Sequence, residues 1–279
     1  MAKMIKTEDI TRVVSELCIK ACNVVSADIR DAMLKFIKTE PDIGKSVLTE
    51  MLKNQDIAAE KNIPICQDTG MVVVFVTIGN EIRIDGDITT AINEGVRLGY
   101  TDGYLRKSVV KDPFDRINTG DNTPAVIHFM YVTGDSLEIV VAPKGFGSEN
   151  MSRVKMLVPA EGLSGVKSFI LETVKLAGPN ACPPIIVGVG VGGTLEYSAL
   201  MAKKALIRKV GTKNQDEFLD KLEADLLEEI NNTGIGPSGF GGKTTALAVH
   251  INTFATHIAG LPVTVNLACH ANRHESVIF

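Results

Sequence analysis

The sequence predicts a layered α/β or α+β fold, because helix-like and strand-like segments interleave along its 279 residues. Apolar residues recur at helical spacing between residues 7 and 61, and β-branched runs follow at Val72–Val76 and Ile185–Val191. Apolar residues make up 45% of the chain and charged residues 22%, which is ordinary for a globular protein. No internal repeat or low-complexity linker interrupts the chain, so we expect one domain over residues 1–279.

The N-terminal part, residues 1–61, is expected to form a helical layer. Thr7 is the predicted N-cap of the first helix, since apolar residues follow it at helical spacing. A second helix is expected over about 26–38, ahead of Pro41, and a third over about 42–54.

Strands and helices interleave in the remainder, and we expect functional loops at strand ends. The turn residues between 132 and 136 predict that the strands on either side form a hairpin. Residues 143–152 are expected to form a loop. The expected helices are 88–106, 164–176, 195–210 and 215–231, and the further strands are 125–132, 136–142, 246–252 and, as the last, 263–267.

Composition argues against two classes of partner. The net charge of −4, the scattered basic residues and an aromatic fraction of 5% without Trp argue against nucleic-acid binding. The longest apolar runs are far shorter than the ~20 residues that cross a bilayer, and the N-terminus lacks a signal-peptide core. We therefore expect a cytoplasmic protein without a membrane partner.

Two glycine-rich segments suggest nucleotide binding. Gly188–Gly193 fits the pattern G-x-G-x-x-G, but the acidic residue expected at the end of a second strand about 20 residues later is missing. Gly241–Thr244 resembles a phosphate-binding loop, but Pro237 stands where that loop needs glycine. A nucleotide-dependent enzyme therefore stays an alternative with weak support.

The five cysteines divide into two groups. Cys18 and Cys22 share a face of a predicted helix, where free cysteines usually pack as small apolar residues. Cys66, Cys182 and Cys269 lie far apart in polar or proline-rich segments beside predicted strands. They are either incidental loop thiols or ligands that converge in space. Three thiolates can hold an iron–sulfur cubane with one open iron, which suits loss or addition of water better than electron transfer.

Seven motifs, in one order along essentially the whole chain, resemble class I, iron–sulfur-dependent fumarate hydratases and the related L-tartrate dehydratases. The resemblance is to the α subunit of the two-subunit form, or equally to the N-terminal domain of the single-chain form. The motifs are ICQDTG (65–70), GSENMSR (147–153), GPNACPP (178–184), GVGVGGT (188–194), GIGPSGFGGKT (234–244), THIAGLPV (256–263) and NLACHANR (266–273).

The resemblance implies a 4Fe–4S cluster held by Cys66, Cys182 and Cys269. It also implies reversible hydration of fumarate to L-malate, or dehydration of tartrate to oxaloacetate. The sequence does not choose between these small dicarboxylates.

The resemblance further implies roles for five residues. Gln67, Arg106 and Gly147 correspond to substrate-binding positions, and Asp68 and His257 are candidates for proton transfer. Without the resemblance, Asp68 could equally cap a turn, and His257 could be a hydrogen-bonded core residue.

The resemblance also implies a β subunit as partner, in a heterodimer or heterotetramer, since the family's other half supplies further active-site residues. A non-catalytic iron–sulfur sensor or scaffold subunit is the remaining alternative.

Overall fold

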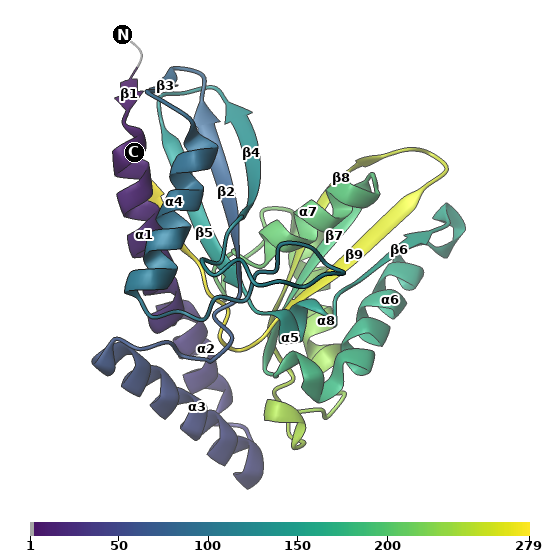
Figure 1. Ribbon diagram of the computed structural model, residues 1–279. Coiled ribbons are helices and arrows are strands. Elements are labelled where there is room, and N and C mark those ends of the chain that lie inside the picture. The colour runs from purple at the N-terminus through teal and green to yellow at the C-terminus, as the bar shows by residue number, and fades with distance from the viewer. Residues whose placement is uncertain (1–2) are drawn as a thin grey trace. The chain divides into compact units, whose positions relative to one another are not determined.

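The computed structural model describes residues 3–279 and confirms a mixed α/β fold (Figure 1). The chain divides into two compact units, each with its own sheet. The first unit comprises the described residues up to Val25, then Asn54–Phe146 and Arg273–Phe279; the second comprises Ser26–Lys53 and Gly147–Asn272. A single domain over the whole chain stays a prediction.

The first unit contains a four-stranded sheet and a small two-stranded one. The four strands lie in the order β10-β5-β2-β4, and β1 pairs with β3. The elements are β1 (Lys3–Ile5), α1 (Thr7–Asn23), β2 (Met71–Gly79), β3 (Ile82–Ile84), α4 (Ile88–Asp102), β4 (Val126–Val132), β5 (Leu137–Lys144) and β10 (Glu275–Ile278); α3 (Asp42–Lys61) contributes its last residues.

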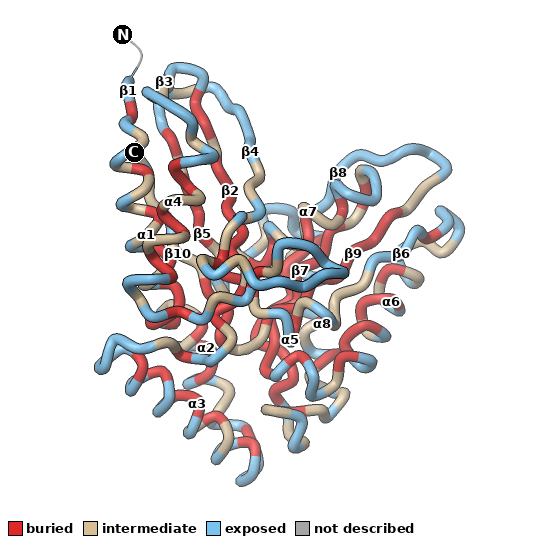
Figure 2. The backbone as a smooth tube through the Cα atoms, viewed as in Figure 1, coloured by how far each residue is buried: buried red, intermediate tan, exposed pale blue. Residues whose placement is uncertain are grey.

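The predicted hairpin between β4 and β5 is wrong, because β2 lies between these strands. Strand β2 pairs in parallel with β4 and antiparallel with β5, so that Val76 is opposite both Phe129 and Ile139. The almost fully buried β2 takes an inner place in the sheet, which leaves β4 at the exposed edge (Figure 2). Strand β10, with four residues after the expected last strand, was not predicted.

Helices α1 and α4 cover one face of this sheet (Figure 1). Alternate β2 residues, Val72, Val74 and Val76, point into the core that they share with these helices. Cys18 and Cys22 of α1 lie fully buried in the same core, which confirms that they are packing residues.

Several predicted helix boundaries need correction. Lys6 is the N-cap of α1, because Thr7 is already helical and donates its backbone N–H and its hydroxyl to Asp85 Oδ1, at 2.7 and 3.0 Å. Helix α3 runs on to Lys61, and α4 ends at Asp102.

The second unit is a sheet with helices on both faces. The strand order is β6-β9-β7-β8; β7 is parallel to β8 and antiparallel to β9. The predicted loop at 143–152 contains the short helix α5, and α7 ends five residues earlier than expected. The elements are α2 (Ala27–Phe36), α5 (Phe146–Glu149), β6 (Arg153–Leu157), α6 (Gly162–Ala177), β7 (Ile185–Gly193), α7 (Leu195–Ala205), α8 (Glu217–Asn231), β8 (Ala246–Thr256) and β9 (Leu261–Ala268), with 3-10 turns at Pro159–Glu161, Gly178–Ala181 and Pro237–Gly239.

The segment that fits G-x-G-x-x-G lies within strand β7, not in a loop between strand and helix. Its glycines let α7 pack directly on the strand: a Cβ on Gly188 would lie 2.3 Å from the backbone oxygen of Ala202, and one on Gly190 would lie 2.0 Å from that of Ser198. The glycine pattern therefore reflects close packing against a helix of the same unit.

We predict that Gly190→Ala destabilises the protein by about 2 kcal/mol or more, because helix backbone already fills the space for the new methyl group. Gly260→Ala is the matched control, since its Cβ would be 3.9 Å from the nearest atom, and it should change stability by less than about 0.5 kcal/mol. Urea unfolding of both variants measures the difference. Equal stabilities would contradict this account of the motif.

Candidate functional site

In the first unit, the segment 65–70 is held by its backbone while its first polar side chains face outward. The Ile65 N–H donates to the backbone oxygen of Cys22 at 3.0 Å, and the Asn54 amide donates to the Ile65 oxygen at 2.9 Å. Cys66 and Gln67 follow directly and are both exposed. The hydrogen bonds of Ile65 therefore fix the backbone from which Cys66 and Gln67 project.

Asp68 is tied at both carboxylate oxygens. Oδ1 accepts the N–H of Gly70 at 3.0 Å, and Oδ2 accepts the N–H of Phe146 at 2.8 Å. The backbone oxygen of Asp68 accepts from Nη1 of Arg273 at 2.6 Å. Asp68 therefore does cap a turn, as its local interpretation predicted, and the same contacts fix its half-buried carboxylate in one direction.

The backbone below Asp68 is supported by buried side chains. The Tyr100 hydroxyl donates to the oxygen of Thr69 at 2.7 Å, and the Asn122 amide donates to the oxygen of Gly70 at 3.2 Å. Tyr100 and Asn122 are both fully buried. Because buried polar groups need partners, these bonds hold the turn in one conformation.

Arg106 is joined to this turn through Thr69. The Thr69 hydroxyl donates to the backbone oxygen of Arg106 at 3.0 Å, and the side chain of Arg106 is exposed. The first unit thus ties the backbone of Arg106 to the turn that carries Asp68, and Gln67 precedes Asp68 in the same segment.

In the second unit, Cys182 and Cys269 lie on adjoining segments. Cys182 has a left-handed backbone with φ 53° and is joined to β7 by Pro183 and Pro184. Its N–H donates to the backbone oxygen of Pro179 at 3.0 Å. Its backbone oxygen accepts from the N–H of His270 at 3.4 Å. Cys269 follows the last residue of β9, which neighbours the start of β7 in antiparallel register.

The loop that contains Gly147 lies at the same end of this sheet. The nearest atom to a Cβ on Gly147 would be the backbone oxygen of Asn180, at 3.7 Å. Ser152, from the same loop, accepts the N–H of Leu267 at 3.0 Å, close to the end of β9.

The glycine-rich loop before β8 braces the Cys182 segment. The Ser238 N–H donates to the oxygen of Pro183 at 2.8 Å, and Gly239 lies against Pro179. The Lys243 N–H is bonded to both carboxylate oxygens of Glu40, each at 3.0 Å. The backbone N–H that a phosphate-binding loop would donate to its ligand is therefore already bonded to a buried carboxylate. This argues against a nucleotide-dependent enzyme.

The turn between β8 and β9 lies at the opposite end of the same sheet (Figure 1). His257 is the first residue of this turn, directly after β8. Strand β9 has eight residues and separates this turn from Cys269, a distance of roughly 23 Å at ~3.3 Å per residue. His257 is exposed and its Nδ1 accepts the N–H of Ala259 at 3.2 Å, so its interpretation as a core residue is wrong. The structure does not bring His257 to Cys182 and Cys269 of its own chain.

The thiols differ in accessibility. Cys66 and Cys182 are exposed and Cys269 is partly exposed. Burial raises the pKa of Cys22 to about 11 and raises that of Cys18 well above its usual value. Among residues 3–279, no three His, Cys, Asp or Glu side chains are grouped closely enough to hold a metal ion.

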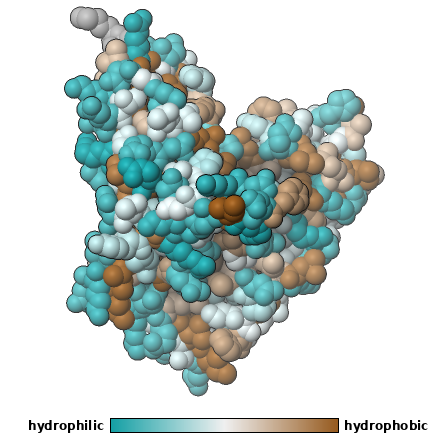
Figure 3. Space-filling model, in the orientation of Figure 1, coloured by the Kyte–Doolittle hydropathy of each residue, from teal (hydrophilic) through white to brown (hydrophobic). Residues whose placement is uncertain are grey.

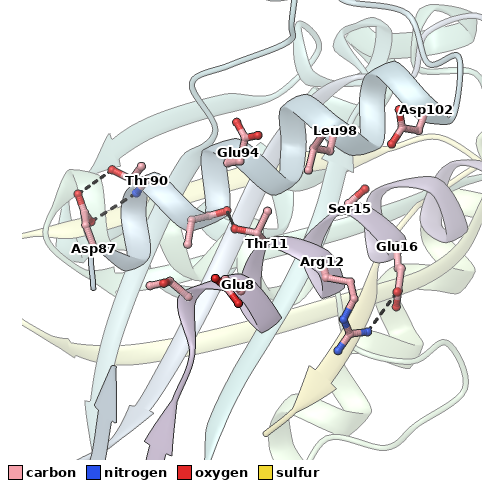
Figure 4. A pocket seen from close by; sticks show the side chains of 12 residues that line it. Glu8, Thr11, Arg12, Ser15, Glu16, Asp87, Thr90, Glu94, Leu98 and Asp102 are labelled. Atoms are coloured by element: carbon pink, nitrogen blue, oxygen red, sulfur yellow. Dashed lines mark hydrogen bonds and ion pairs between the residues drawn. The ribbon is translucent and has the colours of Figure 1, made fainter. Parts of the chain in front are cut away.

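A separate hollow of about 720 Å³ lies between α1 and α4 in the first unit (Figure 4). Thr11 and Thr90 line it together with charged side chains such as Arg12 and Glu94. In Figure 3 the helical face of this unit, at the upper left, is mostly hydrophilic. None of the predicted site residues lines this hollow, so we do not assign it to the site.

The family model for fumarate hydratase ("Fumerase") matches residues 11–278. The chain belongs to the fumarate hydratase family.

Relatives in this family align over nearly the full chain. A Methanocaldococcus jannaschii protein named "Putative L(+)-tartrate dehydratase subunit alpha" is 42% identical, with 95% of each chain covered. Proteins named "L(+)-tartrate dehydratase subunit alpha" from Escherichia coli O157:H7 and from Escherichia coli K12 are 32% and 31% identical, covering 96% of this chain and 90% of theirs. In residues 3–279, no helix is long and apolar enough to cross a membrane.

We predict that Cys66, Cys182 and Cys269 of the folded apoprotein react with iodoacetamide at least about tenfold faster than Cys18 and Cys22. The reason is that alkylation needs an accessible thiolate, which burial suppresses. Mass spectrometry after short exposure at neutral pH gives the modified fraction at each position. Equal rates at all five cysteines, without unfolding, would contradict the division into three accessible and two buried thiols.

Proposed function

We propose that this chain is the α subunit of an iron–sulfur hydro-lyase that reversibly hydrates fumarate to L-malate. The observation that carries the proposal is a segment with exposed Cys66 and Gln67 next to Asp68. Thr69 of this segment is bonded to the backbone of Arg106, and the chain belongs to the fumarate hydratase family. Dehydration of L-tartrate to oxaloacetate is the second candidate, because the relatives reported above are named for it.

The donor set fits an iron–sulfur cluster by its chemistry. Cys66, Cys182 and Cys269 are accessible thiols on loops beside strands, whereas Cys18 and Cys22 are buried among apolar side chains. We assign the first three as the residues that would hold a 4Fe–4S cluster. When bound, a cluster with three protein ligands supplies a Lewis acid for the departure or addition of water.

The polar side chains of the first unit suit a dicarboxylate. The exposed guanidinium of Arg106 can bind one substrate carboxylate through two parallel N–H groups. Gln67, next to Cys66, can donate its amide to the same substrate, and the exposed backbone of Gly147 offers a further contact. These groups would orient the substrate for proton transfer.

Asp68 is the proposed proton-transfer group. In dehydration it would take the proton from the carbon beside the one that carries the hydroxyl, and in hydration it would return that proton. The N–H groups of Gly70 and Phe146 each occupy one of its oxygens but leave further lone pairs available.

We propose a β subunit as the partner of this chain. The chain covers at least 90% of each relative reported above, and each of these is named as subunit alpha. The β subunit would complete the substrate site.

For His257 we propose a role in the active site of a second copy of this chain. Its turn is separated from Cys269 by the whole of β9, so Cys182 and Cys269 of its own chain are out of reach. A second copy would bring His257 to another set of cysteines.

The function is tested with the α chain reconstituted anaerobically together with its β subunit. We expect turnover of L-malate or L-tartrate, and loss of both cluster and turnover in Cys66→Ser, Cys182→Ser and Cys269→Ser. Cys18→Ala is the matched control and should keep its iron and sulfide. Equal cluster content in all four variants would overturn the ligand assignment, and a cluster-loaded wild type without hydro-lyase activity would overturn the function.

Mixing two defective α chains tests the role of His257. His257→Ala and Cys182→Ser, each inactive alone, should recover about a quarter of wild-type turnover when co-expressed with the β subunit. About half of the α pairs are then mixed, and about half of the sites in a mixed pair carry both intact residues. No recovery, or full activity of His257→Ala alone, would contradict a shared site.

A further inference from the structure

Arg273 is a buried charged residue of the first unit, separated from β10 only by His274. Its side chain is only 4% exposed. Burial of a guanidinium is unfavourable unless hydrogen bonds and an opposite charge compensate for the lost water. The contacts of Arg273 therefore indicate what it does in the fold.

Arg273 contacts the Asp68 turn and the strand end beside it. Arg273 Nη1 donates to the backbone oxygen of Asp68 at 2.6 Å. A Cβ on Gly145 would lie 2.9 Å from Arg273 Nη2 and 3.1 Å from Asp68 Oδ2, so the guanidinium and the carboxylate flank the same glycine. The space left by the missing side chain lets both groups approach this strand end.

The charge of Arg273 also acts on the buried residues below the turn. Burial raises the pKa of both Cys22 and Tyr100, and the positive charge of Arg273 opposes this rise in each case. Tyr100 is the residue whose hydroxyl bonds to Thr69, so Arg273 and Tyr100 both contact the turn that presents Asp68.

We propose that Arg273 is a positioning residue for Asp68, because it holds the Asp68 backbone and borders its carboxylate at Gly145. The inference rests on the proposed function, in which Asp68 transfers the proton. Arg273 follows Cys269 by four residues in the same motif, so one segment would supply both a cluster ligand and the support of Asp68.

The charge and the planar shape of Arg273 can be tested separately. In the reconstituted complex, we expect Arg273→Ala to lower kcat by at least about tenfold and to change KM by less than about twofold. Arg273→Lys should recover part of this loss, because it restores the charge but not the paired donors. The matched control is Arg208→Lys in the second unit, where the arginine pairs with Glu223 and contacts no proposed site residue; its kcat should be unchanged.

Chemical rescue separates positioning from a general structural role. Millimolar guanidinium should restore part of the kcat of Arg273→Ala, but should not restore Asp68→Asn. Amide hydrogen exchange in peptides covering 66–70 and 144–148 should be faster in Arg273→Ala, because the N–H groups that bind the Asp68 carboxylate lose their fixed partner. Iron and sulfide content should stay at the wild-type level.

If Arg273→Ala does not fold, Gly145→Ala provides the test without a change of charge. Its methyl group would separate Arg273 Nη2 from Asp68 Oδ2, and kcat should fall while the cluster remains. Wild-type kcat in Gly145→Ala or Arg273→Ala, or loss of kcat without guanidinium rescue, would overturn the inference alone. A wild-type complex that turns over none of the dicarboxylates would overturn the proposed function itself, and with it the role of Asp68.

Discussion

The candidate site depends on one constraint: the buried backbone of residues 69–70 must find hydrogen-bond partners. Tyr100 and Asn122 provide them from α4 and from a loop before β4, and both side chains are fully buried. Because unpaired buried carbonyl groups are costly, the turn has little conformational freedom. The backbone of residues 69–70 in turn fixes the position of Asp68 and of the exposed residues before it. Thr69 also holds the backbone of Arg106 through its hydroxyl.

The sequence predicted the elements whose signals are local. The apolar run in β2, the glycine loop before β8 and the packing of Cys18 and Cys22 follow from residue type and spacing alone. Strand pairing is not local: β4 and β5 are separated by a short turn, yet both pair with β2. An inner strand such as β2 needs hydrogen-bond partners for its backbone groups along both edges, and these come from strands at any distance in the sequence. The short strand β10 was not predicted because its four residues carry no clear local pattern. Only its pairing with β5 makes it a strand.

Candidate site residues were found from their motifs, whereas the residues that support them were not. Arg273 and Glu40 are charged residues that a sequence alone would place on the surface. Both are buried because they bond to backbone groups of a functional loop, Arg273 at Asp68 and Glu40 at Lys243. The only sequence signal was that Arg273 belongs to the motif of Cys269. The glycines of β7 are the opposite case. Their spacing fits a nucleotide-binding motif, but the structure uses them to pack a helix on the strand.

The central claim is that Cys66, Cys182 and Cys269 hold a cluster in which one iron has no protein ligand. Mössbauer spectroscopy of the reconstituted α–β complex, before and after addition of malate, tests it most directly. We expect four irons per α chain, one of which changes its spectrum when malate binds, as for a site with an open coordination position. Four irons that all keep their spectra with bound malate would contradict it.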